Sequence, residues 1–428
     1  MTDRLKPTWP ALGPVLFAGV LVVYAAGVPL GLDRVGTASR VAAGLGLDST
    51  GQEAAAPLSL LATRLVAYLP LGDGPARANL ASAVLAALAL ALLGRLCVEL
   101  LVAFRPPPHA RQGQHHFFHE PLLAAGAVLA GGLSLACFHA ATSAGAGAAT
   151  LALLAGAWLI ALPLLRGEGG ARHGFILAGL AGLAAGVDPV AGPLLWPLAF
   201  GLWLWELRRG SRWPLLAPLL FVATLGGTLL ASVAASHAQE NFAHLWSGLW
   251  PSGIDDRTVV LRTATEFCDE LGVVGLLLAA VGTLAVLRRS PLVGLWFGFT
   301  LVTALLLGRP FGASGQVLAP MRPGLPAALL AAAVPICAGA TELAARLGRG
   351  RIFTAVVLAA LSVVSPLLDG GTSRWRRDTR GAERLLEHAL LRSPLRASVD
   401  PGTAEMDGLF RYGAALGLRP DLEIARRR

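Results

Sequence analysis

Charged residues are scarce in this sequence of 428 amino acids. Asp, Glu, Lys and Arg together make up 14% of it, whereas a soluble globular chain carries about 25%. Hydrophobic residues make up 55%, and the mean hydropathy is +0.63. This composition argues against a soluble fold and predicts a protein that lies in a lipid bilayer.

Lysine is almost absent, because Lys6 is the only one and arginine supplies the rest of the formal net charge of +9. The arginines are scattered between apolar stretches and form no continuous basic patch. A surface that follows nucleic-acid phosphates would need such a patch, whereas scattered cations are typical of membrane topology signals. We therefore expect no nucleic acid among the partners of this chain.

Cysteine is also rare, and its spacing excludes two kinds of site. Cys97, Cys137, Cys268 and Cys337 lie far apart, and three of them fall within apolar stretches. They form neither a disulfide framework nor a CxxC metal motif.

A second candidate metal cluster lies in "HARQGQHHFFHE", residues 109–120, where His115, His116 and His119 precede Glu120. These residue types do bind zinc. The segment falls in a loop that the charge pattern assigns to the cytoplasm, with no supporting group, so we predict no metal and no cofactor.

Apolar stretches recur along the chain, and a helix needs about 20 such residues to cross the hydrocarbon. The candidate spans are residues 9–32, 79–104, 121–141, 146–165, 174–187, 190–207, 213–236, 271–287, 291–308, 320–341 and 351–368. The first is too long for a cleaved signal peptide, and more spans follow it. The pattern predicts an all-α polytopic membrane protein with about 11 transmembrane helices over residues 1–368, and a tail over residues 369–428.

The charges between the spans predict an orientation. With the N-terminus in the cytoplasm, every short inner loop carries two or three arginines or lysines, for example Arg208, Arg209 and Arg212. Two of the outer loops carry none, and the arginines of the long outer loops count for less. We therefore expect a bacterial inner-membrane protein with a cytoplasmic N-terminus and an extracytoplasmic C-terminus.

Two outer loops, residues 33–78 and 237–270, are long enough to form a site. In the first, Leu58, Leu61, Leu65 and Tyr68 recur at helical spacing opposite Arg64, which predicts a helix on the membrane surface. In the second, Trp246 and Trp250 are spaced as interfacial anchors. The tail reads as a helix, an extended piece, a second helix and the strand-like "RPDLEIA", an incomplete α/β unit.

The first outer loop carries a resemblance to a known family. In "PLSLLATRLVAYLPLGDGPARANLASAVLAALALALL", residues 57–93, a Pro-Leu start is followed by "LP-G" and by an Asn-Leu pair that opens the next span. This block resembles a bacterial family of multi-pass proteins of unknown function related to protein O-mannosyltransferases, in the GT-C glycosyltransferase superfamily. Looser similarity runs through "LSLACFHAATSAGAGAATLALLAGAWL", "NFAHLWSGLWP" and "GLRPDLEI".

The resemblance implies a GT-C-like fold and an inverting sugar transfer from a polyprenyl-phosphate donor to an outward-facing protein or glycan acceptor. Asp33, just outside the first span, would be the base that takes the proton of the acceptor hydroxyl. Glu53 would be the second acid. The phosphate would be held by arginines, for which the candidates are Arg257, Arg262, Arg309 and Arg322.

Two departures from the family favour a second hypothesis. The family has Asp-Ser-Gly-Glu after the first span, whereas this chain has "DRVG", with Gly36 in place of the second acid. The family's His-Pro-Pro-Gly reads "QEAA", residues 52–55, so its histidine is missing. A non-catalytic membrane scaffold, or a lipid-glycan binding protein of the same fold, would tolerate both losses. A transporter is a third reading, but the spans offer few polar groups to line a path.

Four polar residues in or beside the spans have simpler structural readings. Asp188, followed by Pro189, is expected to start a helix. Arg95 and Glu99 are spaced i, i+4 and are expected to form a local ion pair in the second span. His139 is expected to be an interfacial histidine.

Overall fold

The computed structural model describes most of the apolar part of the chain. It covers residues 12–29, 57–67, 74–103, 119–143, 145, 147–188, 190–236, 257–307, 324–346, 356–357, 360, 381–392, 398–399, 409–410, 412–413 and 423–424.

Nearly all of these residues are helical. They form the helices α1 (Leu12–Gly27), α3 (Pro57–Ala67), α4 (Gly74–Ala103), α5 (His119–Gly132), α6 (Leu135–Thr142), α7 (Gly147–Leu165), α8 (Ala171–Val187), α9 (Ala191–Arg208), α10 (Ala217–Ser236), α12 (Arg257–Arg289), α13 (Pro291–Leu306), α14 (Leu325–Arg346) and α16 (Gly381–Arg392). A short 3₁₀ turn, η3 (Trp213–Leu215), joins α9 to α10. Strands β1 (Ser398–Val399) and β2 (Glu423–Ile424) pair in parallel.

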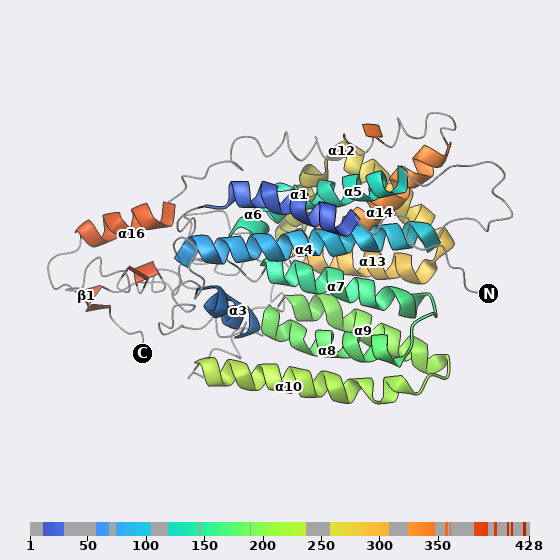
Figure 1. Cartoon of the computed structure of the whole chain (residues 1–428), viewed down its shortest axis with the longest axis horizontal. Helices are drawn as coiled ribbons and strands as arrows, with labels where there is room; N and C mark the ends of the chain where they lie inside the picture. The colour runs from blue at the N-terminus through green and yellow to red at the C-terminus, as the bar shows by residue number, and fades with distance from the viewer. Residues whose placement is uncertain are drawn as a thin grey trace.

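Five helices of the described chain are long and apolar enough to cross a membrane, or six if the bent pair α5–α6 is one span. Helices α1, α8 and α13 are shorter apolar helices. Figure 1 shows the long helices running side by side along one axis. The fold is that of an all-α membrane protein, while the count of eleven spans stays a prediction, because residues 351–368 lie mostly outside the described residues.

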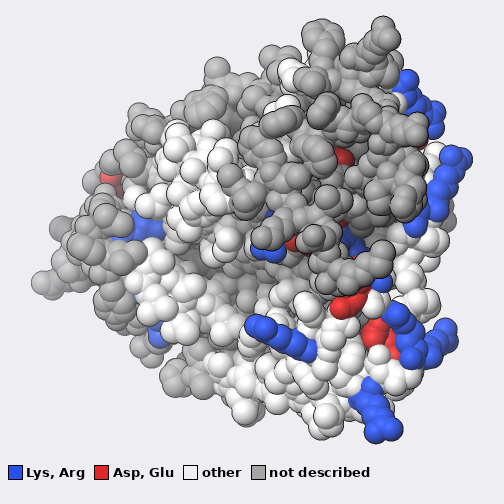
Figure 2. All heavy atoms as spheres, turned by 45° about the vertical axis from the view of Figure 1, so that its right-hand side comes forward, with Lys and Arg blue, Asp and Glu red and all other residues white. Residues whose placement is uncertain are grey.

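The bundle has two chemically different ends. At one end lie Ala103, Leu165, Arg208 and Arg289, the last residues of α4, α7, α9 and α12 (Figure 1). We call it the basic end, because it carries Arg95, Arg166, Arg172, Arg208, Arg209, Arg212, Arg288, Arg289 and Arg346. Figure 2 shows Lys and Arg side chains gathered along it. The other end, which we call the α3 end, holds α3, the last turn of α1, the first turn of α4 and the turn between α8 and α9. The loops predicted to be cytoplasmic are those of the basic end.

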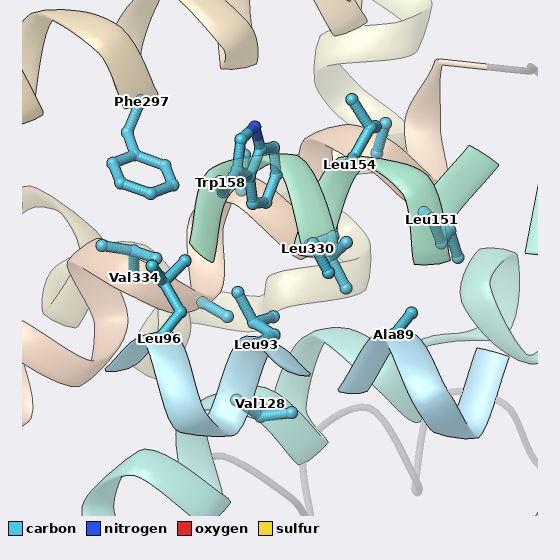
Figure 3. Close-up of a cluster of buried hydrophobic side chains, with 14 of the residues drawn as sticks. Ala89, Leu93, Leu96, Val128, Leu151, Leu154, Trp158, Phe297, Leu330 and Val334 are labelled. Carbon is cyan, nitrogen blue, oxygen red and sulfur yellow. The ribbon is translucent and has the colours of Figure 1, made fainter. Parts of the chain in front are cut away.

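Aliphatic and aromatic side chains from α4, α5, α7, α13 and α14 fill the centre of the bundle (Figure 3). Trp158 is fully buried there, and its ring meets that of Phe297 edge-on, with centroids 5.4 Å apart. Leu93, Leu330 and Val334 lie around this aromatic pair (Figure 3). In lipid this packing stabilises the fold mainly through close van der Waals contact.

Burial separates the central helices from the peripheral ones. In the α14 span 78% of the residues are buried, whereas in the span formed by η3 and α10 only 22% are. Leu219, Val222 and Leu230 of α10 are exposed. An exposed apolar face of this length is expected where a helix contacts lipid acyl chains.

Glycines allow two of the close helix contacts. A Cβ atom at Gly282 of α12 would overlap the backbone oxygen of Pro335 in α14, and one at Gly339 of α14 would overlap that of Leu278 in α12. Between α8 and α10, Gly182 and Gly186 lie against Thr224 and Thr228 in the same way. Small residues let helix backbones approach closely in a membrane, which is how these pairs pack.

Three sequence expectations need correction in detail. Helix α12 begins at Arg257, so the second half of the expected outer loop 237–270 is helical. The expected span 121–141 is two helices that meet at an angle of 75°. Helix α4 begins at Gly74 and not at residue 79. The helix predicted in the first outer loop is present as α3, and its Leu61 and Leu65 are exposed. Its position on a membrane surface stays a prediction. Tyr68, Trp246 and Trp250 lie outside the described residues.

The contact between α12 and α14 gives a test of this packing. Gly282→Ala should destabilise the fold by about 1–3 kcal/mol, because the new methyl group meets rigid backbone. The matched control is Gly227→Ala on α10, where an added Cβ has nothing within 4 Å. The measurement is the thermal unfolding midpoint of both variants in the same detergent, and an equal midpoint for the two would contradict the contact.

Candidate functional site

Most of the predicted site residues lie where the structure gives no side chain. Asp33, Glu53, Arg309 and Arg322 lie outside the described residues. Arg257 and Arg262 lie in the first turns of α12, and only their backbone is described. The described residues nearest to Asp33 in the chain are Val28 and Pro29, at the end of α1, so the surroundings of these two residues frame the candidate site.

A broken helix lies beside the end of α1. Helix α5 ends at Gly132 and α6 begins at Leu135, with Leu133 and Ser134 between them. A Cβ at Gly132 would overlap the Leu90 side chain of α4, and one at Gly131 would lie 2.7 Å from the Leu329 backbone oxygen of α14. The two glycines therefore let α5 end between two neighbouring helices. The break leaves backbone N–H and C=O groups without their usual helical partners.

The carbonyl groups at this break have partners from two sides. The hydroxyl of Tyr24 in α1 donates to the Gly132 carbonyl oxygen at 2.6 Å, and Tyr24 is fully buried. The hydroxyl of Ser134 donates to the Gly131 carbonyl oxygen at 2.6 Å. Such bonds matter in an apolar interior, where no bulk water can take the place of a missing donor.

A carboxylate satisfies the N–H groups. Glu270 of α12 accepts from the Leu135 amide at 2.6 Å and from the Ala136 amide at 3.1 Å. The Ser134 hydroxyl also accepts from the Cys137 amide at 3.4 Å, as an N-cap does. A negative charge at this position also interacts favourably with the positive end of the α6 dipole.

Glu270 lies next to a second break. Gly272 has φ 63° and ψ 174°, which is not helical, so α12 consists of two helical pieces. That backbone conformation is open to glycine and costly for other residues. The chain changes direction two residues after Glu270, and the two interrupted helices, α5–α6 and α12, are joined through this one carboxylate.

Residues next to the break hold the end of α1. The Phe138 ring of α6 lies against Gly27, where a Cβ would overlap it, and meets Tyr24 edge-on at 5.7 Å. The Asn79 side-chain amide of α4 donates to the Pro29 carbonyl oxygen at 3.2 Å in a buried position. Residues of α4 and α6 therefore contact the end of α1 and the chain just after it, as far as Pro29, which is four residues before Asp33.

Asp188 is held in the turn between α8 and α9. Its carboxylate accepts from the Thr150 hydroxyl of α7 and from the Val190 amide, each at 3.0 Å. The Ser59 hydroxyl of α3 donates to the neighbouring Val187 carbonyl oxygen. Asp188 thus closes the turn that leads into α9, which agrees with its structural reading.

The expected ion pair in α4 is present near the basic end. Arg95 Nε lies 2.9 Å from Glu99 Oε1, with Arg95 largely exposed. Arg166, just after α7, donates to the Glu99 backbone oxygen. Burial lowers the pKa of Arg166, and the carboxylates of Glu99 and Glu168 oppose this shift.

The histidine-rich stretch gives no metal centre in the described part of the chain. There, no three His, Cys, Asp or Glu side chains lie close enough together to hold a metal ion. Glu120 is buried at the start of α5, while His115 and His116 lie outside the described residues. His139 is partly buried on α6, within the described bundle.

The acids of α12 were not expected to have a role. Glu266, Asp269 and Glu270 were counted in an outer loop, and none was proposed as a site residue. A signal was present, because three acids stand within five residues directly before a long apolar run. Without the partner helix α6, nothing in the sequence indicates that Glu270 turns inward while Asp269 is exposed.

Comparison with models of known protein families gives no match to this chain, and neither does a search of curated proteins.

The Glu270 contact gives a direct test. Glu270→Ala should leave the Leu135 and Ala136 amides without their acceptor, at a cost of about 1–3 kcal/mol for each unsatisfied group. Amide hydrogen exchange of peptides that contain residues 134–138 should then become faster. The control is Asp269→Ala, which removes an exposed acid one residue away. Unchanged exchange in the Glu270 variant would show that the carboxylate does not hold this break closed.

Proposed function

We propose that this protein is a GT-C-like membrane glycosyltransferase that moves a sugar from a polyprenyl-phosphate donor to an outward-facing protein or glycan acceptor. The proposal starts from the resemblance of residues 57–93, which form α3 and the first part of α4. It also takes the α3 end of the bundle as the extracytoplasmic side, as the arginine distribution favours.

One observation carries the proposal. Asn79 belongs to the Asn-Leu pair on which the resemblance rests, and its side chain binds the Pro29 carbonyl at 3.2 Å. This bond ties the chain just before Asp33 to the start of α4. A side chain used as a base has to be held in place relative to its substrate, and a buried tether so close to it supports that role for Asp33.

The chemistry follows from what the resemblance implies. An acceptor hydroxyl attacks C1 of the sugar, its proton passes to the Asp33 carboxylate, and the bond from C1 to the lipid phosphate oxygen breaks. The configuration at C1 is inverted. Arginines steady the departing phosphate, and the candidates are Arg257, Arg262, Arg309 and Arg322. Glu53 is the candidate for the second acid. We assign no base role to Glu270, because its two carboxylate oxygens already accept backbone amides.

The alternative is a non-catalytic membrane scaffold or a lipid-glycan binding protein of the same fold. It is favoured by the sequences "DRVG" and "QEAA", which lack the second acid and the histidine of the family. Under this alternative, the Asn79 contact and the Glu270 contact serve only to hold the bundle together.

A donor-turnover assay distinguishes the transferase from the non-catalytic alternative. Full-length protein in lipid nanodiscs is given radiolabelled polyprenyl-phosphate mannose, and then the glucose and galactose donors, with a peptide rich in Ser and Thr. Transfer should occur with at least one donor, and Asp33→Asn should lower its rate at least 100-fold, within the range of general-base catalysis. Asp269→Asn is the control, an exposed acid outside the proposed machinery. Absence of turnover by the wild-type protein with all three donors would favour the scaffold.

A second variant tests the tether. Asn79→Ala should lower the transfer rate about 10-fold or more, because misplacement by about 1 Å can cost two orders of magnitude. Ser82→Ala is the matched control, since within the described residues the Ser82 hydroxyl bonds only in its own helix, to the Ala78 oxygen. Both variants should unfold within a few degrees of each other. Equal transfer rates for the two variants would show that the Asn79 bond does not position Asp33.

A further inference from the structure

The corner between α9 and α10 at the basic end has features that the proposed transfer does not use. Three arginines at this corner, Arg172, Arg208 and Arg212, are exposed. Their guanidinium groups have no hydrogen bond or ion pair within the part of the chain that the structure describes. By contrast, Arg209 in the same turn bonds the buried Glu206 carboxylate at 3.2 Å. The corner therefore presents cations that its own acids do not neutralise.

Packing brings the start of α8, which carries Arg172, against the turn that carries Arg208 and Arg212. The Trp213 ring lies against Gly174 of α8, where a Cβ would overlap it, and meets Phe175 edge-on. Arg172 and Arg212 come shortly before these contacting residues, at the start of α8 and of η3. Arg208 is the last residue of α9, whose Trp203 meets Phe221 of α10 with ring centroids 5.9 Å apart.

Apolar side chains border the arginines on the same turn. Leu204, Trp205 and Leu207 are exposed at the end of α9, and Leu215, Leu216 and Leu219 are exposed along η3 and the start of α10. Exposed tryptophan beside arginine and leucine is typical of the level where lipid headgroups meet acyl chains. The apolar face continues along α10, which is the peripheral helix of the bundle.

We propose that this corner binds the headgroup of an anionic phospholipid, with the phosphate on Arg172, Arg208 and Arg212 and the acyl chains along the exposed face of α10. Guanidinium groups bind phosphate oxygens bidentately. In a zwitterionic headgroup, the cation next to the phosphate weakens the attraction of that phosphate to the arginines. Charge complementarity thus selects the lipid, and the leucines hold it at the right depth. Figure 2 shows arginine side chains projecting from this end of the molecule.

The test counts bound lipids. The purified full-length protein, stripped of lipid in detergent, is titrated with equal amounts of dioleoyl phosphatidylglycerol and dioleoyl phosphatidylcholine, and native mass spectrometry reports the occupancy of each. The wild-type protein should prefer phosphatidylglycerol. Arg208→Gln with Arg212→Gln should lower that affinity about 25-fold, from about 5-fold for each arginine, and leave phosphatidylcholine binding unchanged.

Further variants keep the outcome decisive. Arg208→Lys with Arg212→Lys retains the charge and should retain most of the preference, so a loss with Gln alone is not a folding defect. Arg288→Gln removes an exposed arginine of α12 at the same end and should change the affinity less than 2-fold. Leu215→Ser with Leu216→Ser should weaken both lipids. The proposal fails if the Gln variant binds like the wild type or if Arg288→Gln has the same effect. Two further results together would indicate a site for free phosphate and would also contradict the proposal. Millimolar inorganic phosphate would displace phosphatidylglycerol, and the variant Leu215→Ser with Leu216→Ser would bind phosphatidylglycerol as the wild type does.

Discussion

The contact of Glu270 with the start of α6 holds together two helices that are both interrupted within the bundle. In a bilayer, backbone N–H and C=O groups must find partners inside the protein, so a helix breaks only where side chains satisfy its open ends. Here Glu270, Ser134 and Tyr24 do so, from three different parts of the chain. The end of α1 packs on the same break through Phe138 and Gly27. The position of the chain that leads to Asp33 therefore depends on this arrangement.

Close helix packing makes this arrangement stable. The backbones of α12 and α14 touch at Gly282 and Gly339, and the part of α12 around Glu270 lies next to α5 and the start of α6. Without that approach, the Glu270 carboxylate would not reach the amides of Leu135 and Ala136. Broken helices near polar groups are recurrent features of membrane proteins that handle charged substrates, because the open helix ends supply fixed dipoles. In this protein a carboxylate occupies the open end, which makes the break a structural support for the site beside it.

The sequence predicted some elements well, for reasons that are local. The apolar runs became helices, the Arg95–Glu99 pair formed at its i, i+4 spacing, and α8 and α9 are separated at Asp188 and Pro189 as expected. Other features were missed because they depend on distant residues. The double glycine at 131–132 did not indicate a bend of 75° until α4 and α14 were seen on either side of it. The acids of α12 were assigned to a loop, since charges in a helix of this kind become acceptable only when a partner is known.

Hydropathy and charge alone predict an all-α membrane protein with arginine at one end of its bundle, because both act residue by residue against lipid and water. Three contacts became visible in the folded bundle: Glu270 closes the break in α5–α6, Asn79 holds Pro29, and the start of α8 lies against Trp213 of η3. These contacts join residues far apart in the chain, and the geometry that brings them together comes from packing, which no local pattern encodes.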